Sequence, residues 1–517
     1  MSQPKLSNQF SKEDEVKSNR NKQPLYNDRR ALLWLGIYAL AALFSGRLTF
    51  FLAAWVGPVF GLRFLRSQKT GRGTLLLFIA TYIPLLISWN GMTAFDMPIY
   101  PVFMLLTSLL AVLPYLFDRW LTPRFAKNGL TPFVASLIFP LALTGIEYLT
   151  MTGGPLGSFG AQAYTQYDFL VFAQLASLTG MWGITFLVTW FGSLVNWAWE
   201  RGFQWQQIKL GVLPYAVIML LVIGYGSVRL LTPPEPTTNV KVASFTAEAF
   251  HPGELFPMVS SDLEGFREKT TSIHDKYIDQ TVAYAQQGAQ IVVWPEMSGS
   301  GYYEDVETLI ERGQTIAHEE GIYLAITAMS LFADENRTDE NKLYIIDPNG
   351  EVAIEHVKYG GNMIEGTLLG DGVLQSIETP YGNLSGVICW DTDYQNKIRQ
   401  VGQMDVDILL SPSYVWPEMG TMHAKMAAFR AIENGVTIVR QEDGGVSAFI
   451  DPYGRFLTTA EHAAGETMIF SDLPVLGSST LYPSIGDIVG QLSIVGFLVM
   501  AVWAIIAGRK PREDLEN

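Results

Sequence analysis

The chain has 517 residues, 49% of them hydrophobic, a formal net charge of −15 and one cysteine. A single thiol excludes an intrachain disulfide, and the excess of acidic residues argues against nucleic-acid binding. Long apolar runs without interleaved charged faces argue against a soluble protein built of buried core helices.

The N-terminal segment, residues 1–30, is polar and mixed in charge. It lacks the apolar core of a cleavable signal peptide, and its composition is typical of a disordered segment. We expect a disordered tail on the cytoplasmic side of a membrane.

Eight apolar runs of about 15 to 29 residues follow, among them "GTLLLFIATYIPLLISW" and the closing "IVGQLSIVGFLVMAVWAIIAG". A helix needs roughly 20 apolar residues to cross a bilayer. The sequence therefore predicts a transmembrane domain of seven spans over residues 31–231, one of them near 170–198, and a C-terminal transmembrane helix over 486–507.

Basic residues in the short loops predict the orientation, because Lys and Arg mark the cytoplasmic side. The loops at 90–97 and 149–168 contain none. Both chain ends are therefore expected inside, and the long segment 238–480 outside. The residues on which this prediction depends are Arg20, Lys22, Arg29, Arg30, Arg63, Arg66, Lys69, Arg72, Arg119, Arg124, Lys127, Arg201, Lys209, Arg509, Lys510 and Arg512.

The predicted outer domain, residues 238–480, has 14 Lys and Arg against 36 Asp and Glu, whereas the remainder has 21 against 14. Short β-rich runs such as "NVKVASFTAEA", "AQIVVWPEM" and "GNLSGVICW" alternate with helical stretches. This alternation, with almost continuously apolar strands, predicts a layered α/β domain whose sheets are covered on both faces. We find no glycine-rich phosphate loop and no metal-spaced His/Cys cluster.

Three chemically capable residues end predicted strands, where loops expose side chains at the rim of a sheet. Glu296 ends "IVVWPE", Lys358 ends "AIEHVK" and Cys389 ends "SGVIC". A poorly solvated carboxylate suits a general base, a fixed cation stabilises a thiolate and an oxyanion, and a thiolate is a nucleophile. Each residue alone also has an ordinary interpretation: a solvated loop acid, a surface lysine and a small buried core residue.

The order of these three residues along the chain, and the sequences around them, favour a catalytic role over the ordinary interpretations. "WPE", a lysine that closes a strand and "GVIC", in that order, resemble the Glu-Lys-Cys triad of the carbon-nitrogen hydrolase (nitrilase) superfamily. "HAKMAAFRAIENGVTIVRQEDGGVSAFIDPYG" resembles a later stretch of the same superfamily. In the membrane half, "EYLTMTGGPLGSFGAQAY" and "AQLASLTGMWGITFLV" are similar to segments of the apolipoprotein N-acyltransferase family.

The resemblance implies an α-β-β-α sandwich outside the membrane, with Glu296 as base, Lys358 as oxyanion cation and Cys389 as nucleophile. The family's supporting glutamate maps best to Glu365. "KYGGNMIEG" departs from the family's usual loop after the lysine, and Trp390 and Asp391 replace its usual Tyr-Glu after the cysteine. Trp390 and Met363 are candidates for excluding water from a thioester.

The implied reaction passes an acyl group from a phospholipid through a Cys389 thioester to the N-terminal amine of a diacylglyceryl-cysteine lipoprotein. No metal or organic cofactor is expected. The implied location is the bacterial inner (cytoplasmic) membrane, with the catalytic domain on its outer face. Two alternatives stay open: a membrane-tethered amidase that uses water as the acceptor, and an inactive receptor or scaffold.

Overall fold

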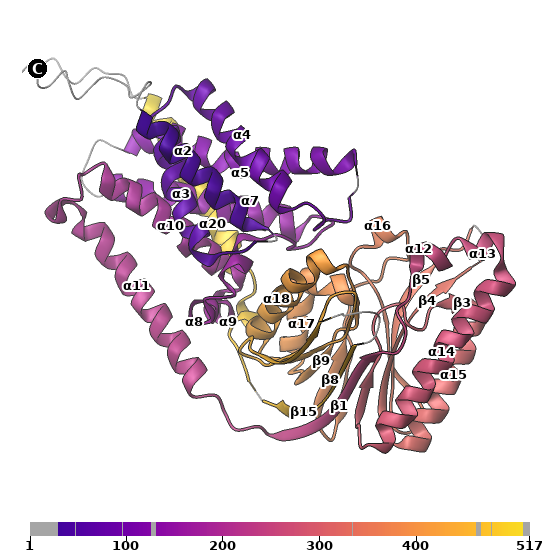
Figure 1. The fold of residues 1–517 in the computed structure, drawn as a ribbon. Coiled ribbons are helices and arrows are strands. Elements are labelled where there is room, and N and C mark those ends of the chain that lie inside the picture. Colours follow the sequence, from indigo (N-terminus) through magenta and orange to yellow (C-terminus); the bar gives the residue numbers. More distant parts are fainter. Residues whose placement is uncertain are drawn as a thin grey trace, which may run out of the picture.

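The computed structural model describes residues 29–46, 48–95, 97–125, 131–332, 334, 336–461, 467–476 and 478–509. The predicted disordered tail lies outside these residues, except for Arg29 and Arg30, which begin the first helix. Figure 1 shows two bodies, a bundle of helices and a layered α/β domain, with the last helix returning into the bundle.

The bundle contains five helices that are long and apolar enough to cross a membrane within the described part of the chain. They are α4 (Thr70–Ser88), α5 (Ile99–Leu121) with the turn that continues it to Phe125, α7 (Ile138–Thr152) with the turn that precedes it from Ala135, α11 (Trp205–Leu231) and α20 (Ile488–Arg509). The other predicted apolar runs also form helices: α2 (Arg29–Ala42), α3 (Phe51–Arg66) and α10 (Met181–Trp199).

The apolar run near 170–198 differs from the prediction in its first third. Gly180, at φ +62°, separates α10 from two single-turn helices. The long helix therefore covers only Met181–Trp199. The short elements of the bundle are η1 (Leu43–Ser45), η2 (Thr122–Phe125), α6 (Thr131–Val134), η3 (Ala135–Leu137), η4 (Gln162–Gln166), α8 (Leu170–Ala173) and α9 (Ala176–Thr179).

The α/β domain contains two sheets that pack face to face, in the strand orders β15-β1-β2-β4-β5-β6, with β3 beside β4, and β14-β13-β11-β9-β8-β7. The first sheet comprises β1 (Thr238–Thr246), β2 (Ile291–Val293), β3 (Gly301–Tyr302), β4 (Tyr323–Leu331), β5 (Glu340–Ile346), β6 (Val352–Val357) and β15 (Thr467–Val475). The second comprises β7 (Ser376–Thr379), β8 (Gly382–Gly386), β9 (Ile408–Leu410), β11 (Thr437–Arg440), β13 (Val446–Ile450) and β14 (Phe456–Glu461).

Helices cover the outer face of each sheet. α14 (Leu263–Gln286) and α15 (Tyr303–Glu320) pack on the first sheet, and α17 (Gln395–Gln403) and α18 (Pro417–Asn434) on the second (Figure 1). The expected α-β-β-α sandwich is thus confirmed. The remaining elements are α12 (Pro252–Leu255), α13 (Met258–Ser261), α16 (Asn362–Glu365), η5 (Cys389–Asp393), β10 (Ser413–Tyr414), β12 (Glu442–Asp443) and α19 (Tyr482–Ile485).

Helix α18 is buried on two sides. Its alanines, among them Ala427 and Ala431, pack on the second sheet. Met422, Met426 and Phe429 instead join the apolar core of the bundle. Helix α18 therefore packs between the core of the bundle and the core of the sandwich.

A loop of the bundle after α7 meets the segment that follows Cys389. The backbone N–H and the hydroxyl of Ser158 donate to the carbonyl oxygen of Asp393, at 2.7 and 2.6 Å. Gly157 has φ +57°, and a Cβ placed there would lie 2.6 Å from the same oxygen. Only glycine fits this approach without a shift.

Gly157→Ala is therefore expected to destabilise the joint between the two bodies. A non-glycine residue at this φ costs about 1 to 3 kcal/mol, and the clash with Asp393 adds to that cost. Gly202→Ala is a matched control, because Gly202 has φ +60° and no atom within 4 Å of its Cβ position.

The comparison is made by thermal unfolding of the purified chains in detergent, followed by tryptophan fluorescence. Gly157→Ala should unfold at a lower temperature than Gly202→Ala. Equal unfolding temperatures would mean that the approach of Gly157 to Asp393 contributes nothing beyond its backbone conformation.

Candidate active site

The structure brings Glu296, Lys358 and Cys389 together at the rims of the two sheets. Glu296 follows β2, Lys358 follows β6 of the same sheet, and Cys389 opens η5 after β8 of the other sheet. All three are buried, with 1%, 1% and 4% of their surface exposed. The strand ends predicted from the sequence thus converge on one site.

Glu296 has hydrogen-bond donors on both carboxylate oxygens. Its Oε1 accepts from Lys358 Nζ at 2.7 Å and from Asn341 Nδ2 at 2.9 Å, and its Oε2 accepts from the backbone N–H of Tyr414 at 3.0 Å. Three donors fix the plane of the carboxylate. A carboxylate oriented in this way is suited to accept a proton from a substrate or a thiol.

The backbone of Cys389 has φ +44°, in the left-handed region that residues other than glycine rarely adopt. Its Sγ donates to the carbonyl oxygen of Tyr414 at 3.5 Å. Burial raises the pKa of the Cys389 thiol well above its ordinary value, and the negative charge of Glu296 raises it further. The positive charges of Lys358 and Arg440 lower this pKa, but they do not cancel the increase. The resting thiol is therefore protonated, and a base must remove its proton before it can attack.

Lys358 pairs with two carboxylates, Glu296 and Glu365. Burial by itself lowers the pKa of the Lys358 ammonium, but the charges of these two acids raise it well above its ordinary value. Burial raises the pKa of Glu365, and the charge of Lys358 opposes that shift. Lys358 is thus a permanent cation within the site.

Asp391 ties the loop after the lysine to the loop of the cysteine. Its Oδ1 accepts from the N–H groups of Tyr359 and Gly360, at 2.9 and 2.7 Å, directly after the lysine. Its Oδ2 accepts from the N–H of Ile388 at 2.9 Å, directly before the cysteine, and contacts His356 Nε2 at 2.8 Å. Asp391 has no exposed surface, so it positions these loops and is not accessible to a substrate.

Trp390 contacts the bundle, whereas Met363 lies at the surface. The indole Nε1 of Trp390 donates to the carbonyl oxygen of Leu156 in the bundle at 3.4 Å, so this side chain bridges the site to the bundle. Met363, on α16, is 86% exposed.

Two residues of the site have no sequence pattern that points to them. Asn341 is the second residue of β5, where a polar residue is ordinary, and Tyr414 contributes only its backbone groups. Only the pairing of β5 with β6 brings Asn341 beside Lys358, whose N–H donates to the carbonyl oxygen of Asn341 at 3.0 Å. Within the described residues, no group of three or more His, Cys, Asp or Glu is arranged to hold a metal ion.

Comparisons with known proteins agree with this architecture. Residues 31–194 match the family model "Apolipoprotein N-acyltransferase N-terminal domain", and residues 242–476 match "Carbon-nitrogen hydrolase". The apolipoprotein N-acyltransferase of Geobacter metallireducens is 26% identical over 441 residues, covering 78% of this chain and 80% of that protein. That of Bradyrhizobium diazoefficiens is 26% identical over 461 residues, covering 76% and 81%.

Among solved structures, an amidase from Nesterenkonia sp. is similar at 20% identity and a TM-score of 0.37, covering 46% of this chain and 93% of that one. The two family models lie on the two bodies of the structure, the first on the bundle and the second on the sandwich that holds Glu296, Lys358 and Cys389. The chain belongs to the apolipoprotein N-acyltransferase family, the membrane-embedded branch of the carbon-nitrogen hydrolase superfamily.

Proposed function

We propose that the chain transfers a fatty acyl group from a phospholipid to the N-terminal amine of a diacylglyceryl-cysteine lipoprotein. The observation that carries this proposal is the buried cluster of Cys389, Lys358 and Glu296, placed beside a loop of a membrane-type bundle. The names of the relatives support the acceptor class.

The first half-reaction forms a thioester. Glu296 takes the proton of the Cys389 thiol, and Sγ attacks the carbonyl carbon of a phospholipid ester. Lys358 and the backbone N–H of Trp390 stabilise the oxyanion. The C–O bond of the ester then breaks, Glu296 returns the proton to the departing alkoxide, and a lysophospholipid leaves.

The second half-reaction forms an amide. The acceptor enters as a free amine, Glu296 removes a proton from its nitrogen as that nitrogen attacks the thioester carbon, and the C–S bond breaks. The proton passes to the sulfur and restores the Cys389 thiol. Water competes with the amine for the same thioester, so the site must exclude it. The burial of all three residues supports that exclusion.

The proposed topology has eight spans, both termini in the cytoplasm and the catalytic domain, residues 238–480, outside the inner membrane. Its support is the arrangement of the bundle ends. At one end, Arg66 pairs with Asp118 at 2.6 Å and with Glu200 at 3.0 Å, so the ends of α3, α5 and α10 that lead into predicted cytoplasmic loops lie together. At the other end of α10, the N–H of Met181 donates to Glu433 of α18, at 2.9 Å.

A thioester trap tests the chemistry. Incubation of the purified chain with phospholipid and no acceptor should add one acyl group, labile to hydroxylamine and visible by intact mass spectrometry. Cys389→Ala should carry none, because the chain has no other thiol. Glu296→Gln and Lys358→Ala should reduce trapping at least 100-fold by removing the base and the oxyanion cation.

The acceptor is tested on the trapped species. A diacylated lipopeptide with a free amino terminus should take the acyl group as an amide, whereas an amidase would release free fatty acid. Acylation of Cys389→Ala, or a wild-type chain that no phospholipid acylates, would contradict the proposed function.

Glu365 is expected to support Lys358 rather than to react. Glu365→Gln removes one of the two carboxylates that pair with the ammonium. We expect thioester formation to slow by about 10 to 100 fold, equivalent to roughly 1.4 to 2.7 kcal/mol. Glu378→Gln is the control, since Glu378 is an exposed acid on the edge strand β7. Equal rates for the two variants would make Glu365 an ordinary loop residue.

The topology is tested with thiols introduced into Cys389→Ala. Glu319→Cys, at an exposed position on α15, should react with a membrane-impermeant maleimide on cells whose outer envelope, if present, has been opened. Arg72→Cys, at an exposed position near the start of α4, should react only after the inner membrane is broken. The reverse pattern would overturn the orientation.

A further inference from the structure

The bundle encloses a cavity of about 450 Å³, within the range of ligand pockets. Its wall along α5 runs from Phe103 to Tyr115. At 1.5 Å per residue this is about 18 Å, more than half of the roughly 30 Å hydrocarbon thickness of a bilayer. Leu110 and Thr150 of the wall are exposed, so the cavity is open to the surroundings of the bundle.

The wall of this cavity is apolar apart from a few polar side chains. Three of its threonines, Thr81, Thr107 and Thr150, donate their hydroxyls to carbonyl oxygens of their own helices, at 2.8 to 3.0 Å. Hydroxyls satisfied in this way leave a surface suited to a hydrocarbon chain.

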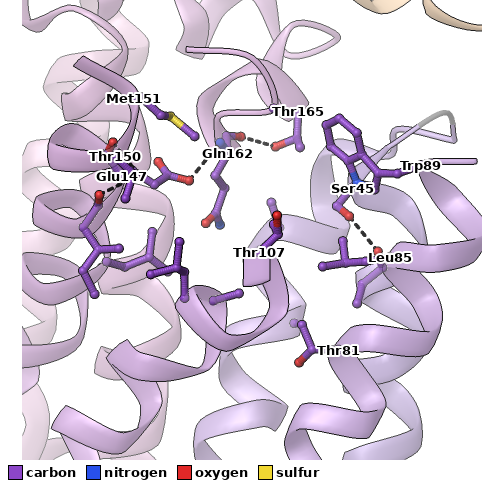
Figure 2. A pocket seen from close by; sticks show the side chains of 18 of the residues that line it. Ser45, Thr81, Leu85, Trp89, Thr107, Glu147, Thr150, Met151, Gln162 and Thr165 are labelled. Atoms are coloured by element: carbon purple, nitrogen blue, oxygen red, sulfur yellow. Dashed lines mark hydrogen bonds between the residues drawn. The ribbon is translucent and has the colours of Figure 1, made fainter. Parts of the chain in front are cut away.

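Glu147 is the exception, and it is the only acid among the described residues that line the cavity. No Lys, Arg or His lines it within that part of the chain. Glu147 Oε1 accepts from the N–H of Gln162 and Oε2 from the hydroxyl of Thr185, each at 3.1 Å. Figure 2 shows the carboxylate beside Gln162 at the cavity wall. Two neutral donors orient the group but leave its charge without a cation.

The position of Glu147 places it close to the catalytic domain. It lies five residues before Thr152, about 7.5 Å along α7, and Thr152 Oγ1 accepts from Gln395 of that domain at 3.3 Å. Leu156, which lines the cavity, accepts from the indole of Trp390, the neighbour of the nucleophile. The cavity therefore extends into the bundle from the contacts that join the bundle to the catalytic domain beside Cys389.

An ionisable residue inside a membrane-type bundle marks a functional site when it faces a cavity, because an unpaired charge there is costly. A cation brought by a ligand would remove that cost. Since the remaining wall is apolar, the ligand must combine a cation with a hydrocarbon chain.

We propose that this cavity binds the primary ammonium group of an acylated substrate, with the ammonium on Glu147 and an acyl chain along the apolar wall toward Tyr38 and Tyr115. The ligand is either an ethanolamine phospholipid donor or the lipopeptide acceptor, which share this chemistry. This inference rests on the proposed function and adds a site for substrate selection.

The test compares wild-type protein with Glu147→Gln, which keeps the size of the side chain and an oxygen acceptor but removes the charge. In the donor arm, thioester formation is measured against the concentration of phosphatidylethanolamine and of phosphatidylglycerol with identical acyl chains. In the acceptor arm, discharge of the preformed thioester is measured against the concentration of a diacylated lipopeptide.

If Glu147→Gln raises the half-saturating concentration of phosphatidylethanolamine at least 10-fold and leaves that of phosphatidylglycerol unchanged, the site belongs to the donor. The same increase for the lipopeptide alone assigns it to the acceptor. Glu147→Asp, which keeps the charge, should retain the preference for the ammonium. The proposal would be overturned if Glu147→Gln left the half-saturating concentrations unchanged in both arms, or raised them equally for all three lipids.

A binding measurement keeps the test decisive if Glu147→Gln does not fold. Dialkyl-ether lipids cannot donate an acyl group, so their binding to Cys389→Ala, followed by native mass spectrometry, is independent of catalysis. An ether ethanolamine lipid or the diacylated lipopeptide should bind more tightly than an ether glycerol lipid. Equal binding of all three would overturn the ammonium site, whereas a wild-type chain that no phospholipid acylates would count against the proposed function instead.

Discussion

The ion pair between Lys358 and Glu296 is the interaction on which the arrangement of the site depends. Both side chains are 1% exposed, and the two charged atoms lie 2.7 Å apart. Removing two ions from water costs several kcal/mol for each, and attraction offsets that cost only where the other hydrogen-bonding positions are also filled. Asn341 of the first sheet and the N–H of Tyr414, in β10, fill them on the carboxylate. The same pair therefore joins the rim of the first sheet to the segment that borders the cysteine.

This ion pair also contributes to the protonation state of the resting cysteine. The negative charge of Glu296 adds to burial in raising the pKa of the thiol, so the proton stays on sulfur at rest. A thiolate held beside a lone cation would be reactive toward any electrophile. In the proposed mechanism the proton leaves only as the bond to the substrate forms, when Lys358 and a backbone N–H group stabilise the developing oxyanion. Cys389 has a positive φ, and its side chain packs among residues of both sheets.

The parts of this protein that the sequence predicts are those set by local patterns. Apolar length predicted the helices of the bundle, alternation predicted the layers, and the order of Glu296, Lys358 and Cys389 predicted residues that the fold then brought together. Asn341 escaped prediction because its role comes from pairing with the neighbouring strand. The break at Gly180 escaped because hydropathy does not register a single left-handed residue. Glu147 escaped as well, since one acid in an apolar run shows its importance only when a cavity is seen beside it.

A polar chain connects the bundle to the surroundings of the nucleophile. The Asp393 carbonyl oxygen accepts from Ser158 of the bundle, and its carboxylate contacts His423 Nε2 at 3.1 Å. His423 Nδ1 lies 2.8 Å from an Arg440 nitrogen. An arginine only donates, so Nδ1 must accept and Nε2 must carry the hydrogen given to Asp393. One tautomer thus satisfies both bonds and holds Asp393 in place. Hydrogen bonds through Ser158, Asp393 and His423 therefore connect the membrane-type bundle to the surroundings of Cys389, and α18 packs against the cores of both bodies.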